Sequence, residues 1–379
     1  MDIQQKKSLR IAIDVRMIES SGIGTYLQNI LSRLIVQQQS WTFYLLGNGN
    51  CLSKNGLTHY PNVQLVEFKS KLFSFCEQLE FFIKIPKNID LFWSPHFVVP
   101  VFYFNRLVTT IHDVLLLAKP EFVKGVFAKA YANIMLRLAC MKSNRIMTVS
   151  EFSKLEIMKF LHFPETQIDV VKLGVDARWF SIPRKTKLLE KPFILCVGNL
   201  KPHKNLKVVL EAFNSVKDNI PYDIVLVGKK DGLRTKDLLL EQLLSKLGER
   251  VHVTGYIEQT QLEQYYRQAA VFIFPSLYEG FGLPPLEALA AGCPRVLCSN
   301  IASIPEVCSD MVEYFDPKEV NQLASLLTKS AQVLDKNRDN IKQRIGYSYD
   351  WNKTTQQTIE SFYRSLTDTK GANEGKSYR

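Results

Sequence analysis

The sequence predicts an α/β protein built from two doubly wound, Rossmann-like domains that face each other across a cleft. Short apolar runs of strand length alternate with helix-length segments, which is the pattern of parallel sheets covered by helices. A charged, proline-containing and poorly periodic segment over 180–191 interrupts this alternation and is the expected linker. The length of 379 residues also fits two domains.

In the first half, the carboxyl ends of the strands carry the polar residues. Apolar strands are expected over 10–15, 41–46, 92–94, 107–111 and 145–149, with a glycine turn at 20–24 that leads into a helix from Thr25. Three of these strands end in the polar segments 94–96, 112–113 and 150–153. Because ligands bind beyond the carboxyl ends of parallel strands, these endings predict one wall of a binding cleft.

The second half repeats the pattern. Strands are expected over 193–197, 224–227, 251–254, 271–274 and 295–298, and helices over 206–216 and 285–291. A last helix over 350–366 has an apolar stripe at three- and four-residue spacing that should pack on another surface. We therefore assign 1–180 to an N-terminal domain and 181–349 to a C-terminal domain. Residues 350–379 form a helix, which could pack back on the N-terminal domain, and a polar tail.

The composition is that of a globular protein, with 46% hydrophobic and 22% charged residues. The most apolar region, 91–104, is too short and too interrupted by prolines to span a membrane, and no export signal is recognisable before residue 14. The cysteines number seven, and none forms a C-x-x-C pair. We therefore expect a cytoplasmic protein without disulfides or a zinc site.

The formal net charge is +11, and residues 1–180 carry 21 Lys and Arg against 14 Asp and Glu. Such an excess suits nucleic acid, an anionic membrane or phosphorylated small molecules, but no nucleic-acid-binding motif accompanies it. Two segments, 69–86 and 124–142, mix cations with aromatic residues in broad stripes. Core packing and peripheral contact with the inner face of an anionic membrane explain these stripes equally well.

The strongest signal for a binding site lies in 275–288, where a buried strand ends at a proline and a glycine loop runs into a helix. The backbone N–H groups of Phe281, Gly282 and Leu283 would point out of this helix start. Unpaired N–H groups at a helix N-terminus form an anion site, so this segment predicts a phosphate-binding site.

Two carboxylates, Glu279 and Glu287, stand eight residues apart beside this phosphate site. Carboxylates repel phosphate and suit hydroxyl-rich groups, such as a ribose and a sugar ring. The plainer alternative is that both carboxylates only complement the helix dipole.

Glu279 and Glu287 also form an E-x7-E motif, and here the sequence resembles the retaining glycosyltransferases of family 4, the "group 1" transferases with a GT-B fold. The resemblance covers most of the chain in the family's order. Its other segments are 22–26 (GIGTY), 110–113 (TIHD), 149–154 (VSEFSK), 173–176 (LGVD) and 197–206 (VGNLKPHKNL). It implies transfer of a sugar from a nucleotide-sugar with retention of anomeric configuration.

The resemblance places the nucleotide-sugar on the C-terminal domain. It implies that Lys204 binds the donor diphosphate, that Glu287 accepts hydrogen bonds from the ribose, and that Glu279 contacts hydroxyls of the transferred sugar. It also implies that the amides of Phe281, Gly282 and Leu283 hold the phosphate and the sugar.

The N-terminal domain becomes the acceptor side. The resemblance implies that Gly22 and Gly24 let the backbone approach the diphosphate and that His112 lines the sugar pocket. The acceptor-side residues are then Asp113, Ser150 and Lys154. With Lys204 and Glu279, His112 makes up the expected catalytic set.

This chain departs from the family pattern at one position. Many members have an arginine after the residue that matches Gly198, where this chain has Asn199. Lys201 lies nearby and is the candidate for the second phosphate-binding cation. Asn199 and Lys201 therefore join the expected donor-binding residues.

The donor prediction rests on 197–206, whose KPHKNL resembles the EPRKNL of the mannosyltransferase-like branch and favours GDP-mannose. UDP- and dTDP-sugars stay open as donors, and a catalytically inactive sugar-nucleotide-binding scaffold is the alternative function. The expected acceptor is a growing surface polysaccharide or a lipid-linked glycan. The resemblance implies no metal and no other cofactor, and we expect no nucleic-acid partner.

Overall fold

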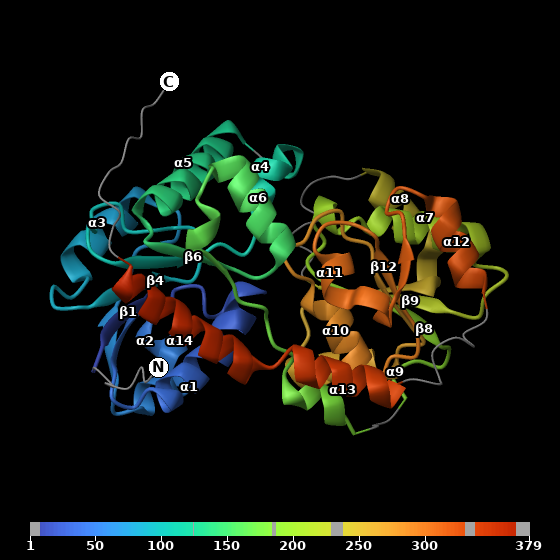
Figure 1. Ribbon diagram of the computed structural model, residues 1–379. Coiled ribbons are helices and arrows are strands. Elements are labelled where there is room, and N and C mark those ends of the chain that lie inside the picture. Colours follow the sequence, from blue (N-terminus) through green and yellow to red (C-terminus); the bar gives the residue numbers. More distant parts are fainter. Residues whose placement is uncertain (1–7, 124, 184–186, 229–237, 330–337, 369–379) are drawn as a thin grey trace. The chain divides into compact units, whose positions relative to one another are not determined.

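The computed structural model describes residues 8–123, 125–183, 187–228, 238–329 and 338–368 (Figure 1). The chain divides into two compact units. Unit 1 is Met1–Leu173 together with Trp351–Arg379, and unit 2 is Gly174–Asp350. Each contains one parallel sheet with helices, so the predicted α/β class is confirmed. Lys124, residues 184–186 of the expected linker and the tail beyond residue 368 lie outside the described residues.

The sheet of unit 1 has the strand order β3-β2-β1-β4-β5-β6-β7. Its strands are β1 (Arg10–Asp14), β2 (Thr42–Gly47), β3 (Val63–Glu67), β4 (Leu91–Ser94), β5 (Leu107–Thr110), β6 (Arg145–Thr148) and β7 (Ile168–Val170). Its helices up to β7 are α1 (Ile23–Gln37), α2 (Gly49–Lys54), α3 (Phe75–Lys84), α4 (Leu115–Ala118), α5 (Val126–Lys142) and α6 (Glu151–Leu161). The order reverses between β1 and β4, whose carboxyl ends therefore flank the usual ligand position of such sheets.

The sheet of unit 2 has the order β10-β9-β8-β11-β12-β13. Its strands are β8 (Phe193–Val197), β9 (Asp223–Val227), β10 (Val251–Gly255), β11 (Val271–Phe274), β12 (Val296–Ser299) and β13 (Glu313–Phe315). Its helices are α7 (Leu206–Val216), α8 (Leu238–Leu247), α9 (Gln259–Gln268), α10 (Leu283–Ala290), α11 (Ile304–Cys308), α12 (Val320–Thr328) and α13 (Arg338–Ser348). Here the order reverses between β8 and β11, which places the loops after these two strands at the switch point.

The chain returns to unit 1 through α14 (Trp351–Thr367), which lies beside α1 (Figure 1). Its buried ring of Phe362 packs against Trp93 and Trp41, with ring centroids 5.3 and 6.5 Å apart. Ser361 donates a hydrogen bond to Asp169 of β7, at 2.7 Å. The apolar stripe of this helix is therefore buried within unit 1.

Several boundaries differ from the sequence assignment. Residues 174–180, which we placed in the first domain, and Asp350 belong to unit 2. The cause at the first boundary is packing: the short 3₁₀ turn Ala177–Ser181 contacts α10, and the ring of Trp179 lies 5.0 Å from that of Tyr266. The strands β3, β7 and β13 were not predicted. Within the described ranges, no helix has the length and apolar character needed to cross a membrane, and all seven cysteines are free thiols.

Candidate functional site

The switch point of unit 2 brings two loops together. Leu277, after β11, donates its backbone N–H to the carbonyl of His203, after β8, at 2.7 Å. Gly228, which follows β9, packs closely against the loop after β8. A Cβ on Gly228 would lie 1.9 Å from the carbonyl oxygen of Gly198. The ends of three neighbouring strands are thus held at fixed positions, which is what a binding site needs.

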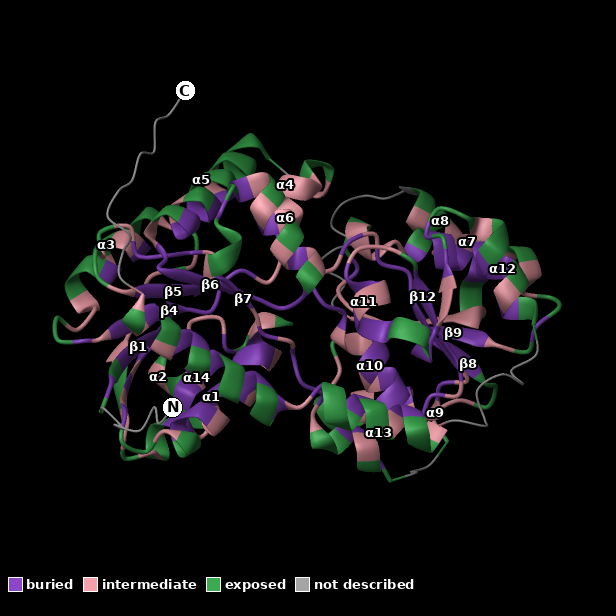
Figure 2. Cartoon of the chain, viewed as in Figure 1, coloured by how far each residue is buried: buried purple, intermediate pink, exposed green. Residues whose placement is uncertain are grey.

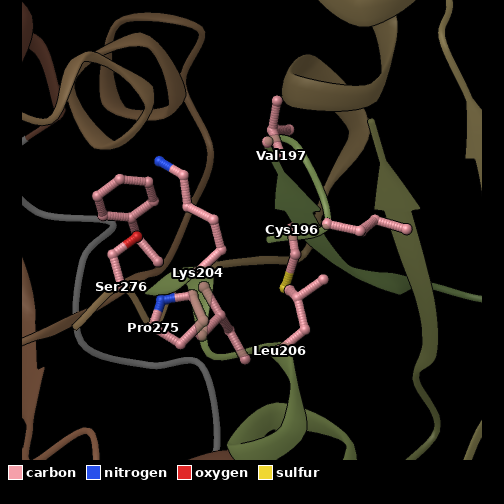
Figure 3. A pocket seen from close by; sticks show the side chains of 10 residues that line it. Cys196, Val197, Lys204, Leu206, Pro275 and Ser276 are labelled. Atoms are coloured by element: carbon pink, nitrogen blue, oxygen red, sulfur yellow. The ribbon is translucent and has the colours of Figure 1, made fainter. Parts of the chain in front are cut away.

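Lys204 and Glu279 meet at this point. The Lys204 Nζ lies 2.5 Å from Glu279 Oε1, with the two side chains 21% and 16% exposed. Lys204 also lines a small cavity with Ser276, whose buried hydroxyl has no hydrogen-bond partner among the described residues (Figure 3). The sequence predicted neither the ion pair nor a role for Ser276. It assigned the donor diphosphate to Lys204 and the hydroxyls of the transferred sugar to Glu279.

The glycine loop leads into α10 as the sequence predicted, with Gly282 in a left-handed conformation at φ 103°. Ser303 donates to the carbonyl oxygens of Glu279 and Phe281, each at 2.9 Å, and so fixes the loop. Residues 284 and 285 are prolines and have no N–H to offer. The N–H groups of Phe281, Gly282 and Leu283 are therefore the first ones available to an anion at this helix start.

Glu287 lies on α10 beside Tyr266 of α9, whose hydroxyl donates to Glu287 Oε2 at 3.1 Å. Burial raises the pKa of Glu287 to about 7, although the Tyr266 hydroxyl and the charge of Arg178 lower it. A carboxylate that is half protonated near neutral pH gains from any ligand that donates hydrogen bonds to it. The ribose role of Glu287 remains a prediction that this setting favours.

The first loop carries the remaining donor-side candidates. Asn199 is half-buried, and Lys201 is exposed at the start of the 3₁₀ turn Pro202–Lys204. Burial and the neighbouring Lys204 lower the pKa of His203 to about 4, so His203 is neutral at pH 7. Lys201 and Lys204 are therefore the cations of this loop.

The glycines of unit 1 have structural reasons of their own. Gly22 caps α1 with φ 58°, in the region that favours glycine. A Cβ on Gly24 would lie only 2.6 Å from the carbonyl oxygen of Ile18. The chain's own packing thus requires Gly24, whether or not a diphosphate approaches it.

His112 follows β5 and is held as a neutral imidazole. Burial lowers the pKa of His112 to about 4, although the hydrogen bond to the Pro95 carbonyl raises this pKa. Its Nε2 lies 3.0 Å from the Pro95 oxygen, so we assign the ring proton to Nε2. Its ring meets the edge of Tyr26, a buried α1 residue that the sequence did not single out as a site residue, at 5.0 Å.

The other acceptor-side candidates have local partners. Asp113 accepts the N–H of Leu115 at 2.9 Å. Ser150 is the buried N-cap of α6, and the Ser153 hydroxyl of that helix donates to the His112 carbonyl at 3.0 Å. Lys154 pairs with Glu165 at 2.8 Å. The structure therefore brings His112 and the start of α6 together.

A buried polar network at the switch point of unit 1 was missed. Asp14 ends β1, and its carboxylate lies 3.0 Å from His96 Nε2 and 2.7 Å from Arg16 Nη2. Burial alone would raise the pKa of Asp14, but Arg16 and His96 hold it well below its usual range. Arg16 also pairs with the buried Glu77 of α3 at 2.8 Å, which in turn accepts the hydroxyl of Tyr131.

The sequence did offer one signal for this network, because the strand ending at 94–96 was noted as polar. The backbone N–H of Val98 donates to His96 Nδ1 at 3.1 Å, which leaves the proton on Nε2, facing Asp14.

Among the residues that the structure describes, no cluster of three or more His, Cys, Asp or Glu side chains could hold a metal.

The candidate residues therefore form two sets. Unit 1 holds Gly22, Gly24, His112, Asp113, Ser150 and Lys154. Unit 2 holds Asn199, Lys201, Lys204, Glu279, Phe281, Gly282, Leu283 and Glu287. Within unit 2, Lys204 and Glu279 are in contact and Glu279 shares a loop with the α10 amides, whereas Lys201 contributes only from an exposed position.

Known proteins resemble this chain over most of its length. Residues 178–345 match the family model "Glycosyl transferases group 1". O-antigen chain mannosyltransferase B of Escherichia coli is 30% identical over 373 residues, which cover 90% of this chain and 96% of the relative. O-antigen chain mannosyltransferase RfbU of Salmonella typhimurium is 26% identical over 271 residues, covering 68% of this chain and 73% of RfbU.

Among solved structures, HepE of Anabaena in complex with UDP and glucose superimposes with a TM-score of 0.75 at 17% identity, covering 94% of this chain and 100% of HepE. That likeness concerns the fold, which is GT-B, with two parallel-sheet α/β domains. The long match at 30% identity extends to the sequence itself. The chain belongs to the group 1 glycosyltransferases, in their mannosyltransferase-like branch.

Proposed function

We propose that this protein transfers mannose from GDP-mannose, with retention of configuration, to a growing surface polysaccharide or a lipid-linked glycan. The observation that carries the proposal is the contact of Lys204 with Glu279 in the loop that leads into α10, at the switch point of unit 2. A lysine and the N–H groups of a helix start can together neutralise the charge that develops on a leaving diphosphate. Both named relatives are O-antigen mannosyltransferases, which supports the sugar and the acceptor class.

The proposed chemistry needs no covalent enzyme intermediate. The acceptor hydroxyl attacks the anomeric carbon from the face that the diphosphate leaves, and the leaving phosphate oxygen takes the hydroxyl proton. Glu279 is already paired with Lys204 and holds sugar hydroxyls rather than acting as a nucleophile. His112 is neutral at pH 7 and donates its ring proton to Pro95, so it accepts a hydrogen bond from a sugar hydroxyl and supplies no acidic proton.

The alternatives are a UDP- or dTDP-sugar donor and a catalytically inactive scaffold. The complex of HepE with UDP and glucose favours the first of these. Thermal-shift titration with GDP, UDP, GDP-mannose and UDP-glucose discriminates between the bases, because a bound ligand raises the melting temperature with the logarithm of its concentration. We expect GDP and GDP-mannose to raise the melting temperature. In an activity assay, we expect radiolabelled mannose to pass from GDP-mannose to acceptors in a lipid extract.

Lys204→Ala supplies the matching activity test. We expect a loss of turnover on the order of 10²-fold or more with an unchanged fold, as for other charge-stabilising donors. The matched control is Lys207→Ala, which removes a lysine of the same unit that pairs on α7 outside the site. Normal turnover of Lys204→Ala with normal donor affinity would contradict the assignment.

We also propose that unit 1 docks on the inner face of an anionic membrane through α3 and α5. In α3 the usual amphipathic arrangement is reversed. Phe75 is 95% exposed and continues in an exposed stripe with Leu79 and Phe82, whereas the buried positions are Glu77 and Phe81. An apolar stripe turned away from the unit's own core indicates a partner surface.

Helix α5 also has an exposed face (Figure 2), and this face carries a second apolar stripe. Phe127, Ile134 and Met141 are all exposed and recur every seven residues, so they share one face of the helix. The helix contains no Asp or Glu, and its exposed residues include Lys129 and Arg137, of which Arg137 lies beside the stripe. Cations beside exposed apolar residues complement an anionic lipid surface, and each adds about 1 kcal/mol close to it.

The loop between β4 and β5 adds two exposed rings, Phe102 and Phe104, which contact α3 and α5 respectively. The rings of Phe82 and Phe102 are 6.1 Å apart, and Lys142 Nζ lies 4.3 Å from the ring of Phe104. We call the set the docking face, and it comprises Phe75, Leu79, Phe82, Phe102, Phe104, Phe127, Ile134 and Met141.

Co-sedimentation with vesicles tests this docking. We expect pelleting with phosphatidylglycerol-containing vesicles at low salt, reduced at high salt, and lost in Phe75→Ser/Phe127→Ser and in Lys129→Glu/Arg137→Glu. Leu155→Ser is the matched control, because Leu155 is exposed on α6 outside the docking face. Absence of pelleting would contradict membrane docking. A monomer–dimer equilibrium that the same variants abolish would also contradict it and would favour a protein partner for the docking face.

A further inference from the structure

Lys204 and Glu279 bind each other before any ligand arrives, although the proposed function gives them different parts of the donor. Their charged atoms are 2.5 Å apart, and both side chains are mostly buried. Lys204 Nζ also lies 5.5 Å from the ring of Phe274, which shields the pair on one side. A diphosphate can recruit Lys204 only by taking it from Glu279.

The backbone cannot adjust to this exchange, because both loops are tied down independently of the ion pair. Leu277 N–H binds the His203 carbonyl, and Ser303 holds the carbonyl of Glu279. Asn205, which follows Lys204, donates to the Pro317 carbonyl at 2.8 Å. The exchange is therefore a movement of two side chains.

Among the residues that the structure describes, Glu279 has no second cation that could replace Lys204. In the described part of the chain, Lys204 is the one residue with a salt bridge to Glu279. His203 is neutral at pH 7, and Lys201 is exposed. The vacated carboxylate must then be satisfied by water or by hydrogen-bond donors that the ligand brings.

We propose that the Lys204–Glu279 pair makes the site prefer the intact nucleotide-sugar over the nucleoside diphosphate that the reaction leaves behind. The inference rests on the proposed function and deepens it. Both ligands bring a diphosphate that takes Lys204, but only the intact donor brings sugar hydroxyls that donate to Glu279. After transfer the sugar leaves Glu279, and Glu279 competes again for Lys204, which weakens the hold on the product.

Isothermal titration of wild type and Glu279→Gln with GDP and GDP-mannose, and with UDP and UDP-glucose, tests the proposal. Removing the carboxylate charge frees Lys204, so we expect the nucleoside diphosphate to bind on the order of tenfold more tightly. The intact donor should gain less or lose affinity. Glu211→Gln is the matched control, because Glu211 pairs with Lys207 in the same unit at 3.7 Å, outside the site.

The double variant Lys204→Ala/Glu279→Gln separates this exchange from a general structural effect. If Glu279 acts through Lys204, its substitution should not tighten diphosphate binding once Lys204 is absent. Unchanged or weaker diphosphate binding in Glu279→Gln would overturn the inference while leaving the proposed function intact. Wild-type protein that binds none of the four ligands would overturn the proposed function itself.

Discussion

At the scale of single residues, the most informative group is Glu287, an acid on α10 whose pKa burial raises to about 7. The usual value is 4.5, so near neutral pH this carboxyl is divided between its two forms. A ribose hydroxyl donates its hydrogen bond to the ionised form and stabilises it. We therefore predict that nucleotide binding lowers the pKa of Glu287 and releases a proton.

The first prediction is a pH dependence of nucleotide affinity. Below pH 7 the ligand must displace the Glu287 proton, so affinity should rise with pH up to about 7 and then level off. In Glu287→Gln the affinity should be lower, and this rise should be absent. Titration calorimetry in buffers of different ionisation enthalpy measures both the affinity and the released proton. An identical pH profile in both proteins would contradict the ribose role.

How much of the site the sequence predicts depends on how far apart its partners lie in the chain. The loop from β11 into α10 is contiguous, so its glycines, prolines and carboxylates were recognisable together. Asp14 and His96 are 82 residues apart and meet only because β1 and β4 are neighbours in the sheet. The Lys204–Glu279 contact was not predicted for the same reason, because the two residues are 75 positions apart in the sequence.

At the scale of elements, the three strands missed by the sequence analysis all lie at sheet edges. β3 and β7 end the sheet of unit 1, and β13 ends that of unit 2. An edge strand has one neighbour and is often short, so it needs no continuous apolar run. β3 illustrates this, because none of its residues is fully buried. The central strands, buried on both faces, carry the apolar runs that made them predictable.

The second prediction concerns the start of α1. Gly24→Ala would place a Cβ 2.6 Å from a backbone oxygen of residue 18, so the helix must shift. We expect a loss of about 1–3 kcal/mol in the free energy of unfolding, measured by urea denaturation. Gly346→Ala is the reference, because Gly346 also lies in a helix without positive φ and its Cβ would make only ordinary contacts, 3.8 Å from the Phe180 ring. Full stability of Gly24→Ala with impaired donor binding would instead favour the ligand role.

At the scale of the whole molecule, the chain builds most of unit 1, then all of unit 2, and returns to unit 1 with α14. That helix supplies Trp351 and Phe362 to an aromatic cluster with Tyr26, Trp41 and Trp93. Residues that precede unit 2 in the sequence and residues that follow it therefore pack in one core. The stability of unit 1 depends on a segment that follows unit 2 in the sequence.

The third prediction tests this dependence. Phe362 is fully buried, and Phe362→Ala should destabilise unit 1 by about 3–5 kcal/mol. Hydrogen exchange followed by mass spectrometry reads the two units separately. Peptides from the unit 1 sheet should lose protection, while those from β8 to β13 keep theirs. Equal loss in both units would contradict a core confined to unit 1.

The fourth prediction is that sugar transfer survives EDTA. The charge of the leaving diphosphate is assigned to Lys204 and to the N–H groups at the α10 start, which no chelator removes. Initial rates measured with EDTA should equal those measured with added Mg²⁺. Complete loss in EDTA that Mg²⁺ or Mn²⁺ restores would show that the assignment is wrong.

The return of α14 to unit 1 has a consequence for how the protein is made. A ribosome adds about 5–20 residues per second, so the interval between Leu173 and Trp351 lasts on the order of 10–40 s. During that time the nascent unit 1 lacks the helix that covers Tyr26, Trp41 and Trp93. Unit 2, which is continuous, can complete its fold first. We therefore expect nascent unit 1 to expose this aromatic surface, which chaperones can shelter, until translation passes α14.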